Sequence, residues 1–198
     1  PDSDGVRQAL ENSMKSVAEI FKSYAVFDDQ GRHINGTDKM SNHNYGDAYE
    51  SLFPDRTGVL LMMEVGVADG SSLLAWRDIF PYATCVGMDI HHSDKAHGER
   101  IEFYLGDQRV KEDCERAAGW REFDVIVEDA THHLLDTLLT LFYLWPFVKP
   151  GGMYIVEEWE NVLGTRKTIK SLWPYAQIVD TVGQSDGVEP LVVFRKPL

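Results

Sequence analysis

The sequence has few of the features that mark secreted and membrane proteins. Only two of its 198 residues are cysteine, Cys85 and Cys114, which excludes a disulfide framework and favours a reducing compartment. No run approaches the ~18 consecutive apolar residues of a membrane helix. The polar start PDSDGVRQALENS has no hydrophobic region of the kind found in signal peptides. We therefore expect a cytoplasmic protein with no membrane partner.

Basic residues are also scarce. Lys and Arg together number 19 against 32 Asp and Glu, so the formal net charge is -13. The basic residues are scattered along the chain, whereas proteins that bind nucleic acid cluster Lys and Arg against the phosphates. This balance argues against nucleic acid as a partner.

The glycine pattern of a dinucleotide site is missing as well. The segment LLMMEVGVADGSSLLAW, residues 60–76, leads from an apolar run through Gly66 and Gly70 into a helical pattern. A strand that delivers such a turn to a helix N-terminus binds a nucleotide-like ligand at the edge of an α/β sheet. Its spacing is E-x-G-x-x-x-G and not the G-x-G-x-x-G that holds a pyrophosphate. The turn therefore indicates a ligand without a pyrophosphate.

The chain does contain a regular alternation of short apolar runs and longer amphipathic ones. With 43% hydrophobic residues, it is long enough for one large domain, and the alternation is typical of a parallel sheet covered on both faces. Strands are expected over residues 59–65, 84–90, 101–105, 123–128 and 153–157, with helices over 71–80, 110–118, 133–147 and 165–173. Two last strands, 177–182 and 191–195, are too close for a crossover helix, which predicts a terminal antiparallel hairpin.

Acidic residues stand at the end of every predicted parallel strand. Because these ends share one edge of the sheet, the carboxylates should meet at its ligand crevice. A single acid there carries little information, since Asp and Glu are common in loops and at helix starts. Asp89 is more informative, because it lies about 20 residues beyond the glycine turn, where an acid accepts the hydroxyls of a ribose.

Together these motifs resemble those of the class I S-adenosylmethionine-dependent methyltransferases. The motifs are MEVGVADG, VGMDI, LGDQ, FDVIVEDATHH, VKPGGMYIVEE and LVVFRK. The pattern GTDK with NYGDAYESLF, the D-x-x-H and the paired acids is similar to the metal-dependent sugar O-methyltransferases of macrolide biosynthesis and to the cephalosporin-hydroxylase-like group. The resemblance implies a Rossmann-like, doubly wound, mostly parallel α/β sheet, S-adenosylmethionine as cofactor and a small-molecule acceptor.

The resemblance also implies where the cofactor lies. Its methionine would lie over the glycine turn, its ribose would meet the acid after the second strand, and its adenine would meet the acid after the third. The implied positions are Glu64, Gly66, Gly70, Asp89, Asp107 and, next to it, Gln108.

The first 56 residues are expected to form an N-terminal helical extension with a cofactor-covering loop, ahead of a methyltransferase domain over 57–198. Helices are predicted over 6–24 and 47–53, separated by a polar stretch, and a long polar loop in a compact domain is often a lid. The candidates in this loop are Thr37, Asp38, Lys39 and Tyr45, with Lys39 able to offset the cofactor carboxylate.

A magnesium site is implied too. Mg²⁺ takes oxygen ligands from a few carboxylates, with water or substrate at the other positions, and the candidates are Asp129, Glu157 and Glu158. Neighbouring residues of a regular strand face opposite sides. Glu157 and Glu158 can therefore both be ligands only if the chain turns there; otherwise one of them is structural.

His132, three residues after Asp129, matches the family's catalytic base. A free histidine has a pKa of about 6.5, so the neutral base is available at cytoplasmic pH. The hypothesis is that His132, assisted by Asp129, takes the proton of an acceptor hydroxyl, whose oxygen attacks the sulfonium methyl in line. The alternative is a surface histidine at a helix start, which is how we interpret His133.

Three functions therefore compete. The first is a metal-dependent O-methyltransferase acting on a hydroxyl of a sugar or other small metabolite. The second is a non-catalytic S-adenosylmethionine-binding protein, which would not need Asp129 and His132. The third, an NAD-dependent oxidoreductase, is disfavoured by the glycine spacing and the terminal hairpin. The sequence leaves open which acceptor substrate is used and whether the protein forms a homo-oligomer.

Overall fold

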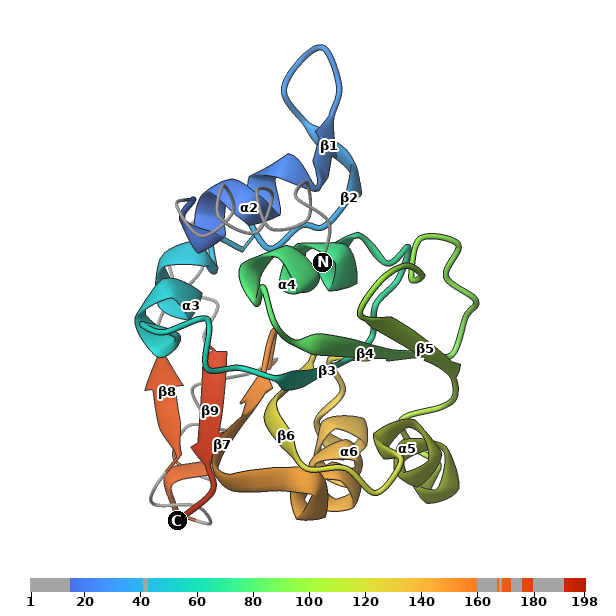
Figure 1. Cartoon of the computed structure of the whole chain (residues 1–198), viewed down its shortest axis with the longest axis vertical. Coiled ribbons are helices and arrows are strands. Elements are labelled where there is room, and N and C mark those ends of the chain that lie inside the picture. Colours follow the sequence, from blue (N-terminus) through green and yellow to red (C-terminus); the bar gives the residue numbers. More distant parts are fainter. Residues whose placement is uncertain (1–14, 41–42, 160–166, 168, 172–175, 180–190) are drawn as a thin grey trace.

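The computed structural model describes residues 15–40, 43–159, 167, 169–171, 176–179 and 191–198 (Figure 1). Parts of three expected elements lie outside these residues: the start of the helix over 6–24, most of the helix over 165–173 and the end of the strand over 177–182.

A seven-stranded sheet in the order β5-β4-β3-β6-β7-β9-β8 forms the centre of the molecule. Neighbouring strands from β5 to β7 are parallel, and β9 runs antiparallel to both β7 and β8. The strands are β3 (Leu61–Val65), β4 (Thr84–Asp89), β5 (Ile101–Leu105), β6 (Phe123–Glu128), β7 (Val148–Val156), β8 (Gln177–Val179) and β9 (Leu191–Arg195). The predicted doubly wound sheet with a terminal antiparallel hairpin is confirmed.

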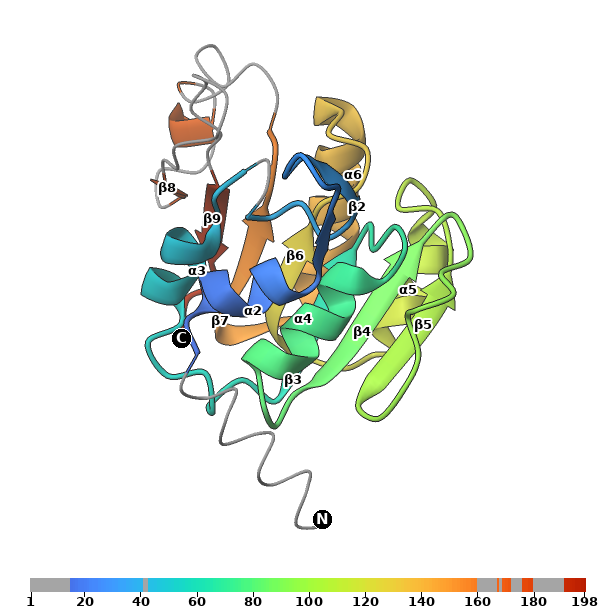
Figure 2. The same ribbon diagram turned by 90° about the horizontal axis from the view of Figure 1, so that it is seen from above.

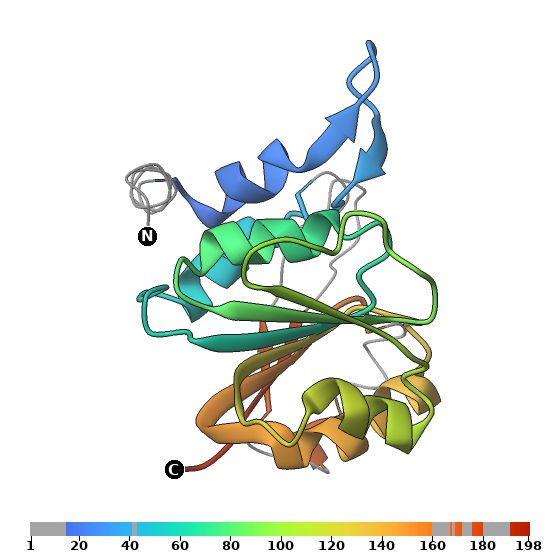
Figure 3. The ribbon, with the colours of Figure 1, turned by 45° about the vertical axis from the view of Figure 1, so that its right-hand side comes forward.

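Helices cover both faces of this sheet, as Figure 3 shows. One face carries α2 (Val17–Ser23), α3 (Gly46–Leu52) and α4 (Ser71–Ile79), and the other carries α5 (Lys111–Ala118) and α6 (Leu134–Leu144). Alternate residues of a strand serve the two cores, so Met62 packs on the α4 side and Met63 on the α5 and α6 side. Burial on both faces explains why the strands read as continuous apolar runs. None of the described helices has the length and apolar content needed to cross a membrane.

The segment before β3 contains a hairpin that the sequence did not reveal. Strands β1 (Ala25–Phe27) and β2 (His33–Gly36) pair antiparallel and project from the body of the molecule beyond α2, which lies across α4 and beside α3 (Figures 1 and 2). The Asp28 carboxylate closes the turn by accepting from the backbone N–H groups of Gln30 and Arg32, both at 2.9 Å. The strands are short and largely exposed, so they lack the apolar alternation that marks a half-buried strand.

Two boundaries differ from expectation near Pro146. The helix expected over 133–147 ends at Leu144, and a 3-10 turn, Trp145–Phe147, follows it. Proline lacks a backbone N–H and cannot continue an α-helix. Strand β7 then begins at Val148, earlier than the expected 153, and pairs with β6 through an irregular register.

The turn from β3 to α4 lies directly against the end of β6. Gly66 adopts a left-handed conformation with φ of 86°, and a Cβ at this position would lie 2.2 Å from the Asp129 carbonyl oxygen. Only glycine avoids both the strain and the clash. This close approach brings the glycine turn and the residue after β6 to one place.

We expect Gly66→Ala to lower the free energy of unfolding by at least about 3 kcal/mol, because backbone strain is added to a clash with backbone. Gly31→Ala is the matched control: Gly31 has φ of 76° in the β1–β2 turn, and a Cβ there would have nothing within 4 Å, so the change should cost only about 1–2 kcal/mol. Urea unfolding measures both values. Equal losses would contradict the close approach.

Candidate active site

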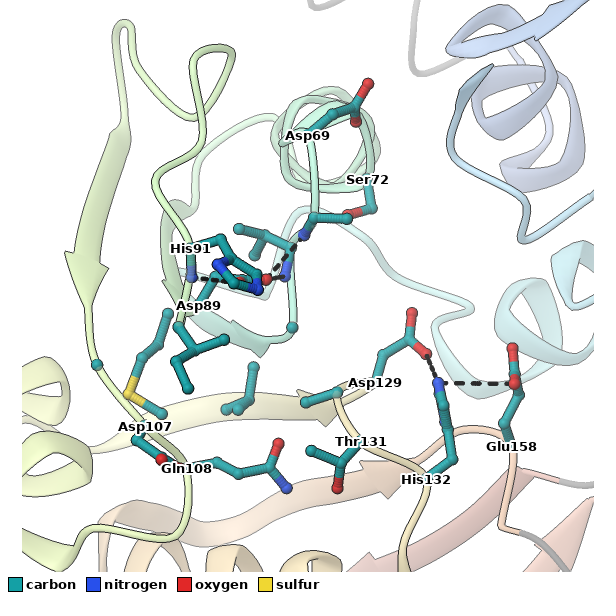
Figure 4. Close-up of a pocket in the computed structure, with 18 of the residues that line it drawn as sticks. Asp69, Ser72, Asp89, His91, Asp107, Gln108, Asp129, Thr131, His132 and Glu158 are labelled. Carbon is teal, nitrogen blue, oxygen red and sulfur yellow. Dashed lines mark hydrogen bonds and ion pairs between the residues drawn. The ribbon is translucent and has the colours of Figure 1, made fainter. Parts of the chain in front are cut away.

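A pocket of about 530 Å³ lies at the carboxyl ends of the parallel strands (Figure 4). It opens where β3 is flanked by β4 on one side and β6 on the other, the switch point at which open α/β sheets bind ligands. The predicted site residues that line it are Thr37, Asp38, Gly66, Asp89, Asp107, Gln108, Asp129, His132 and Glu158. Those outside its lining are Lys39, Tyr45, Glu64, Gly70 and Glu157.

Asp89 fixes the glycine turn. Its Oδ2 accepts from the backbone N–H groups of Val67 and Ala68, at 3.0 and 2.9 Å, and its Oδ1 accepts from that of His91 at 2.8 Å. An ionised carboxylate has about four acceptor positions. Three are used by the backbone, and capacity for a ligand hydroxyl remains at Oδ1.

The loop after β5 contributes Asp107 and Gln108. The Asp107 carboxylate pairs with Arg109, with Oδ2 2.6 Å from Nη2, and hydrogen bonds from Arg109 lower its pKa. Gln108 is buried, and its Nε2 donates to Glu128 Oε1 at 3.1 Å. Burial raises the pKa of Glu128 to about 7, despite hydrogen bonds from Thr137 and Gln108 that lower it.

Lys39 lies behind the pocket, among three carboxylates. Its Nζ is 2.7 Å from Asp129 Oδ2, 2.7 Å from Glu157 Oε2 and 3.3 Å from Glu64 Oε1, and its side chain is 1% exposed. Burial lowers the pKa of Lys39, but the charges of the three carboxylates outweigh this effect and raise it well above its usual value. Lys39 is therefore a charged ammonium that partly neutralises the acidic end of the sheet.

Glu64 and Gly70 support the glycine turn from within. The Glu64 carboxylate accepts from Ser72 Oγ at 2.7 Å and from Trp76 Nε1 at 2.9 Å, both on α4. Gly70 caps the N-terminus of α4 with φ of 88°, and a Cβ there would lie 2.6 Å from the backbone nitrogen of Ala96. Both residues fix the entry to α4, and neither reaches the pocket.

The adjacent glutamates after β7 have different surroundings. Strand β7 ends at Val156, and Glu158 has a left-handed φ of 45°, so the chain turns between the two side chains. Both Glu157 oxygens are engaged: Oε2 with Lys39, and Oε1 with the Tyr49 hydroxyl, which donates to it. Burial raises the pKa of Glu157. Glu158 instead faces the pocket.

Two histidines lie beside Glu158. His132 Nε2 is 3.6 Å from Glu158 Oε2 and 3.9 Å from Asp129 Oδ1, as Figure 4 shows. His43 Nε2 is 2.7 Å from Glu158 Oε1 and 3.2 Å from Asp38 Oδ2. Burial raises the pKa of Glu158, but the two histidines lower it further, so the net shift is downward.

Thr37 and Tyr45 have separate positions in the loop that precedes α3. Thr37 lines the pocket, and its backbone N–H donates to the Tyr24 carbonyl at 3.2 Å. Tyr45 is buried, stacks on His43 with ring centroids 5.2 Å apart, and accepts from the backbone N–H of Glu158 at 3.4 Å. Tyr45 therefore supports the turn at Glu158 from outside the pocket.

The donor set at the pocket suits a hard divalent cation. The potential ligand atoms of Asp129, His132 and Glu158 lie within 4.8 Å of one another, as do those of Asp38, His43 and Glu158. Carboxylate oxygens are the ligands that Mg²⁺ prefers. Asp129 Oδ1 and Glu158 Oε2 both face His132, whereas Lys39 already occupies the space between Asp129 and Glu157.

Sequence reasoning assigned no role to His43, Tyr49 or Glu128. Tyr49 and Glu128 had a weak signal, since each places a polar group in an otherwise apolar helix or strand pattern, where a buried partner is required. His43 had none: Asp38 is close to it in the sequence, but Glu158, whose Oε1 is 2.7 Å from His43 Nε2, comes from a distant part of the chain.

Solved structures that are similar to this chain include several methyltransferases. The MycE methyltransferase from the mycinamycin biosynthetic pathway, in complex with Mg, SAH and mycinamycin VI, has a TM-score of 0.69 at 22% identity, over 92% of this chain and 55% of that chain. A putative ribosomal RNA methyltransferase from Plasmodium falciparum has a TM-score of 0.56 at 16% identity, over 77% and 94%. The fold is that of the class I S-adenosylmethionine-dependent methyltransferases.

In sequence, the chain is a relative of sugar O-methyltransferases. It is 30% identical over 157 residues to the 8-demethyl-8-alpha-L-rhamnosyl tetracenomycin-C 2'-O-methyltransferase of Streptomyces olivaceus, over 72% of this chain and 38% of that protein. It is 32% identical over 127 residues to the mycinamicin VI 2''-O-methyltransferase of Micromonospora griseorubida, over 59% and 31%. No protein-family profile matches. The predicted resemblance to macrolide-sugar O-methyltransferases is confirmed, and the chain spans less than two fifths of these relatives.

Lys39→Met should lower the free energy of unfolding by roughly 3–5 kcal/mol, because it leaves buried carboxylates without their cation. In the control Lys149→Met, the lost ammonium pairs with Asp124 at 2.8 Å but is half exposed, and the loss should be about 1 kcal/mol or less. Both values come from denaturant unfolding. A Lys39 variant as stable as the control would show that the buried cluster contributes no more than a surface pair.

Proposed function

We propose that this chain is an S-adenosylmethionine-dependent and Mg²⁺-dependent O-methyltransferase that acts on a hydroxyl of a sugar or other small metabolite. The observation that carries the proposal is a single pocket joining the glycine turn and Asp89 to His132 between two carboxylates. The glycine turn would bind a nucleoside-like ligand, and the histidine would act as the base that a methyl transfer to a hydroxyl requires. The names of the sequence relatives, which are O-methyltransferases of sugar-bearing compounds, support the same activity.

The cofactor would occupy the part of the pocket nearest β3, β4 and β5. Gly66 lets the backbone approach closely, Asp89 Oδ1 retains capacity for a ribose hydroxyl, and Asp107 and Gln108 bound the end where adenine would lie. Thr37 closes the pocket from the segment before the sheet. This division supports residues 57–198 as the catalytic domain, with the segment ahead of it as a cover.

Mg²⁺ would be held by Asp129 and Glu158, with water and substrate completing its ligands. When bound, it would lower the pKa of an acceptor hydroxyl and fix its position. Glu157 would remain the partner of Lys39 and Tyr49, because both of its oxygens are engaged there.

His132 would take the proton from the acceptor hydroxyl at Nε2. The oxygen then forms a bond to the methyl carbon as the bond from that carbon to the sulfonium sulfur breaks, and S-adenosylhomocysteine leaves without the sulfonium charge. The imidazolium formed on His132 is stabilised by Asp129 and Glu158, both within 4 Å of Nε2.

His132→Ala should lower kcat roughly 10²–10⁴-fold, the usual contribution of a general base, while the Kd for S-adenosylhomocysteine is retained. His133→Ala is the matched control, since His133 is exposed and outside the pocket lining. Release of S-adenosylhomocysteine is followed over a panel of sugar and polyol acceptors. Cofactor binding without release across the panel would favour the non-catalytic alternative, and near-wild-type turnover of His132→Ala would remove the base assignment.

A titration with Mg²⁺ distinguishes the roles of Glu157 and Glu158. Glu158→Gln should raise the Kd for Mg²⁺ at least about tenfold, because it removes a ligand, while Glu157→Gln should mainly lower stability by weakening the Lys39 contact. Calorimetry with Mg²⁺ and thermal unfolding measure the two effects. A larger loss of Mg²⁺ affinity in Glu157→Gln would assign the ion to Glu157 instead.

A further inference from the structure

The two oxygens of the Glu158 carboxylate contact different histidines. Oε2 lies 3.6 Å from His132 Nε2, the contact drawn in Figure 4, and Oε1 lies 2.7 Å from His43 Nε2. His132 lines the pocket, whereas His43 is outside the lining and its side chain is 10% exposed. One oxygen of Glu158 is therefore engaged by the loop that precedes α3, and the other is directed toward the pocket.

The contact between His43 and Glu158 is a hydrogen bond in which His43 donates. Asp38 Oδ2 also lies close to His43 Nε2, at 3.2 Å, and an ionised carboxylate only accepts hydrogen bonds. Nε2 therefore carries the hydrogen and shares it between Glu158 and Asp38, with Glu158 nearer. A Mg²⁺ ion with its ligands at ~2.1 Å would set neighbouring ligand atoms about 3 Å apart. The 2.7 Å contact fits a hydrogen bond better than two ligands of one ion.

The imidazole ring of His43 is itself fixed by Tyr45. The two rings stack with centroids 5.2 Å apart and an interplanar angle of 12°. Tyr45 is fully buried, and its hydroxyl accepts from the Glu158 backbone N–H at 3.4 Å, so the loop holds Glu158 both at its carboxylate and at its backbone. Glu158 lies beyond the end of β7 with a left-handed φ of 45°, and the strand therefore does not fix the direction of its side chain.

We propose that His43 is a positioning residue: by donating to Glu158 Oε1, it holds the carboxylate so that Oε2 faces the pocket, where the cation would bind. The inference rests on the proposed function, in which Glu158 is a ligand of Mg²⁺. A carboxylate that is already oriented loses less side-chain freedom when it binds an ion, and hydrogen bonds from outside the ligand set orient metal ligands in this way. His43 therefore raises the affinity for Mg²⁺ without touching the ion or the cofactor.

The test uses two replacements that separate the hydrogen bond from the ring. His43→Phe keeps a ring that can stack on Tyr45 but removes the donor, so it should raise the Kd for Mg²⁺ at least about tenfold, while the Kd for S-adenosylhomocysteine is retained. His43→Gln has no ring but carries an N–H donor that can reach Glu158, and it should return the Mg²⁺ affinity close to the wild-type value. Calorimetry measures both constants.

The matched control is His92→Phe. His92 also stacks on an aromatic ring, that of Phe103 at 6.0 Å, but it is exposed and outside the pocket lining, so both constants should be unchanged. Far-UV circular dichroism verifies folding, and His43→Leu, which also lacks the donor, replaces His43→Phe if that variant does not fold. Wild-type Mg²⁺ affinity in folded His43→Phe would overturn the inference. An equal loss in His43→Phe and His43→Gln would also overturn it, because the donor would then not be the cause.

A measurement without metal separates this inference from the proposed function. Absence of Mg²⁺ binding by the wild type would contradict the metal dependence in the proposed function itself. Thermal unfolding without metal is then compared for His43→Phe, Glu158→Ala and the double variant. Each single change removes the contact between the two residues, so the shift in unfolding temperature of the double variant should be smaller than the sum of the two single shifts. Additive shifts would show that His43 does not hold Glu158.

Discussion

One buried ammonium group connects the segment before the sheet with three strand ends. Lys39 Nζ is within 3.3 Å of carboxylate oxygens of Glu64, Asp129 and Glu157, which could not be buried together without a cation. The contact holds the chain after β2 against the pocket and directs one Asp129 oxygen inward and the other toward His132. The acidic end of the sheet is thereby divided in two. Glu64 and Glu157 form an internal group whose charge Lys39 largely neutralises, and Asp129, His132 and Glu158 form a pocket group that is open to a ligand.

The pocket group depends on backbone conformations that are unfavourable for the residues that adopt them. Ala68, His132 and Glu158 all have φ between 45° and 55°, a left-handed conformation that costs roughly 1–2 kcal/mol per non-glycine residue. Such strain persists only where the surroundings fix it, and it concentrates at functional sites. At Glu158 the consequence is direct, because the turn sends two adjacent glutamates into different environments.

The parts of the molecule that sequence predicts well are those where one physical pattern dominates. The parallel strands follow from the apolar runs, and the terminal hairpin follows from the short distance between the last two runs. The acid at the end of each parallel strand can be read directly from the sequence. The β1–β2 hairpin escaped because its strands are short and exposed, and the helix over 133–147 was overextended because Pro146 lies within an apolar pattern. Lys39 was predicted to offset the cofactor carboxylate, whereas the structure pairs it with protein carboxylates that lie 25 to 118 residues away along the chain, beyond the reach of any local pattern.

The sequence by itself determined the fold class, the chemical types at each strand end and the proximity of those ends, because strand periodicity and chain direction bring them to one edge. Tertiary structure alone decided how these groups are divided: Glu157 with Lys39 and Tyr49, Glu158 with His132, and Gln108 with Glu128. The physical reason is that the partner of a polar side chain depends on how deeply that side chain is buried and on where it points. Both depend on contacts between segments far apart in the chain.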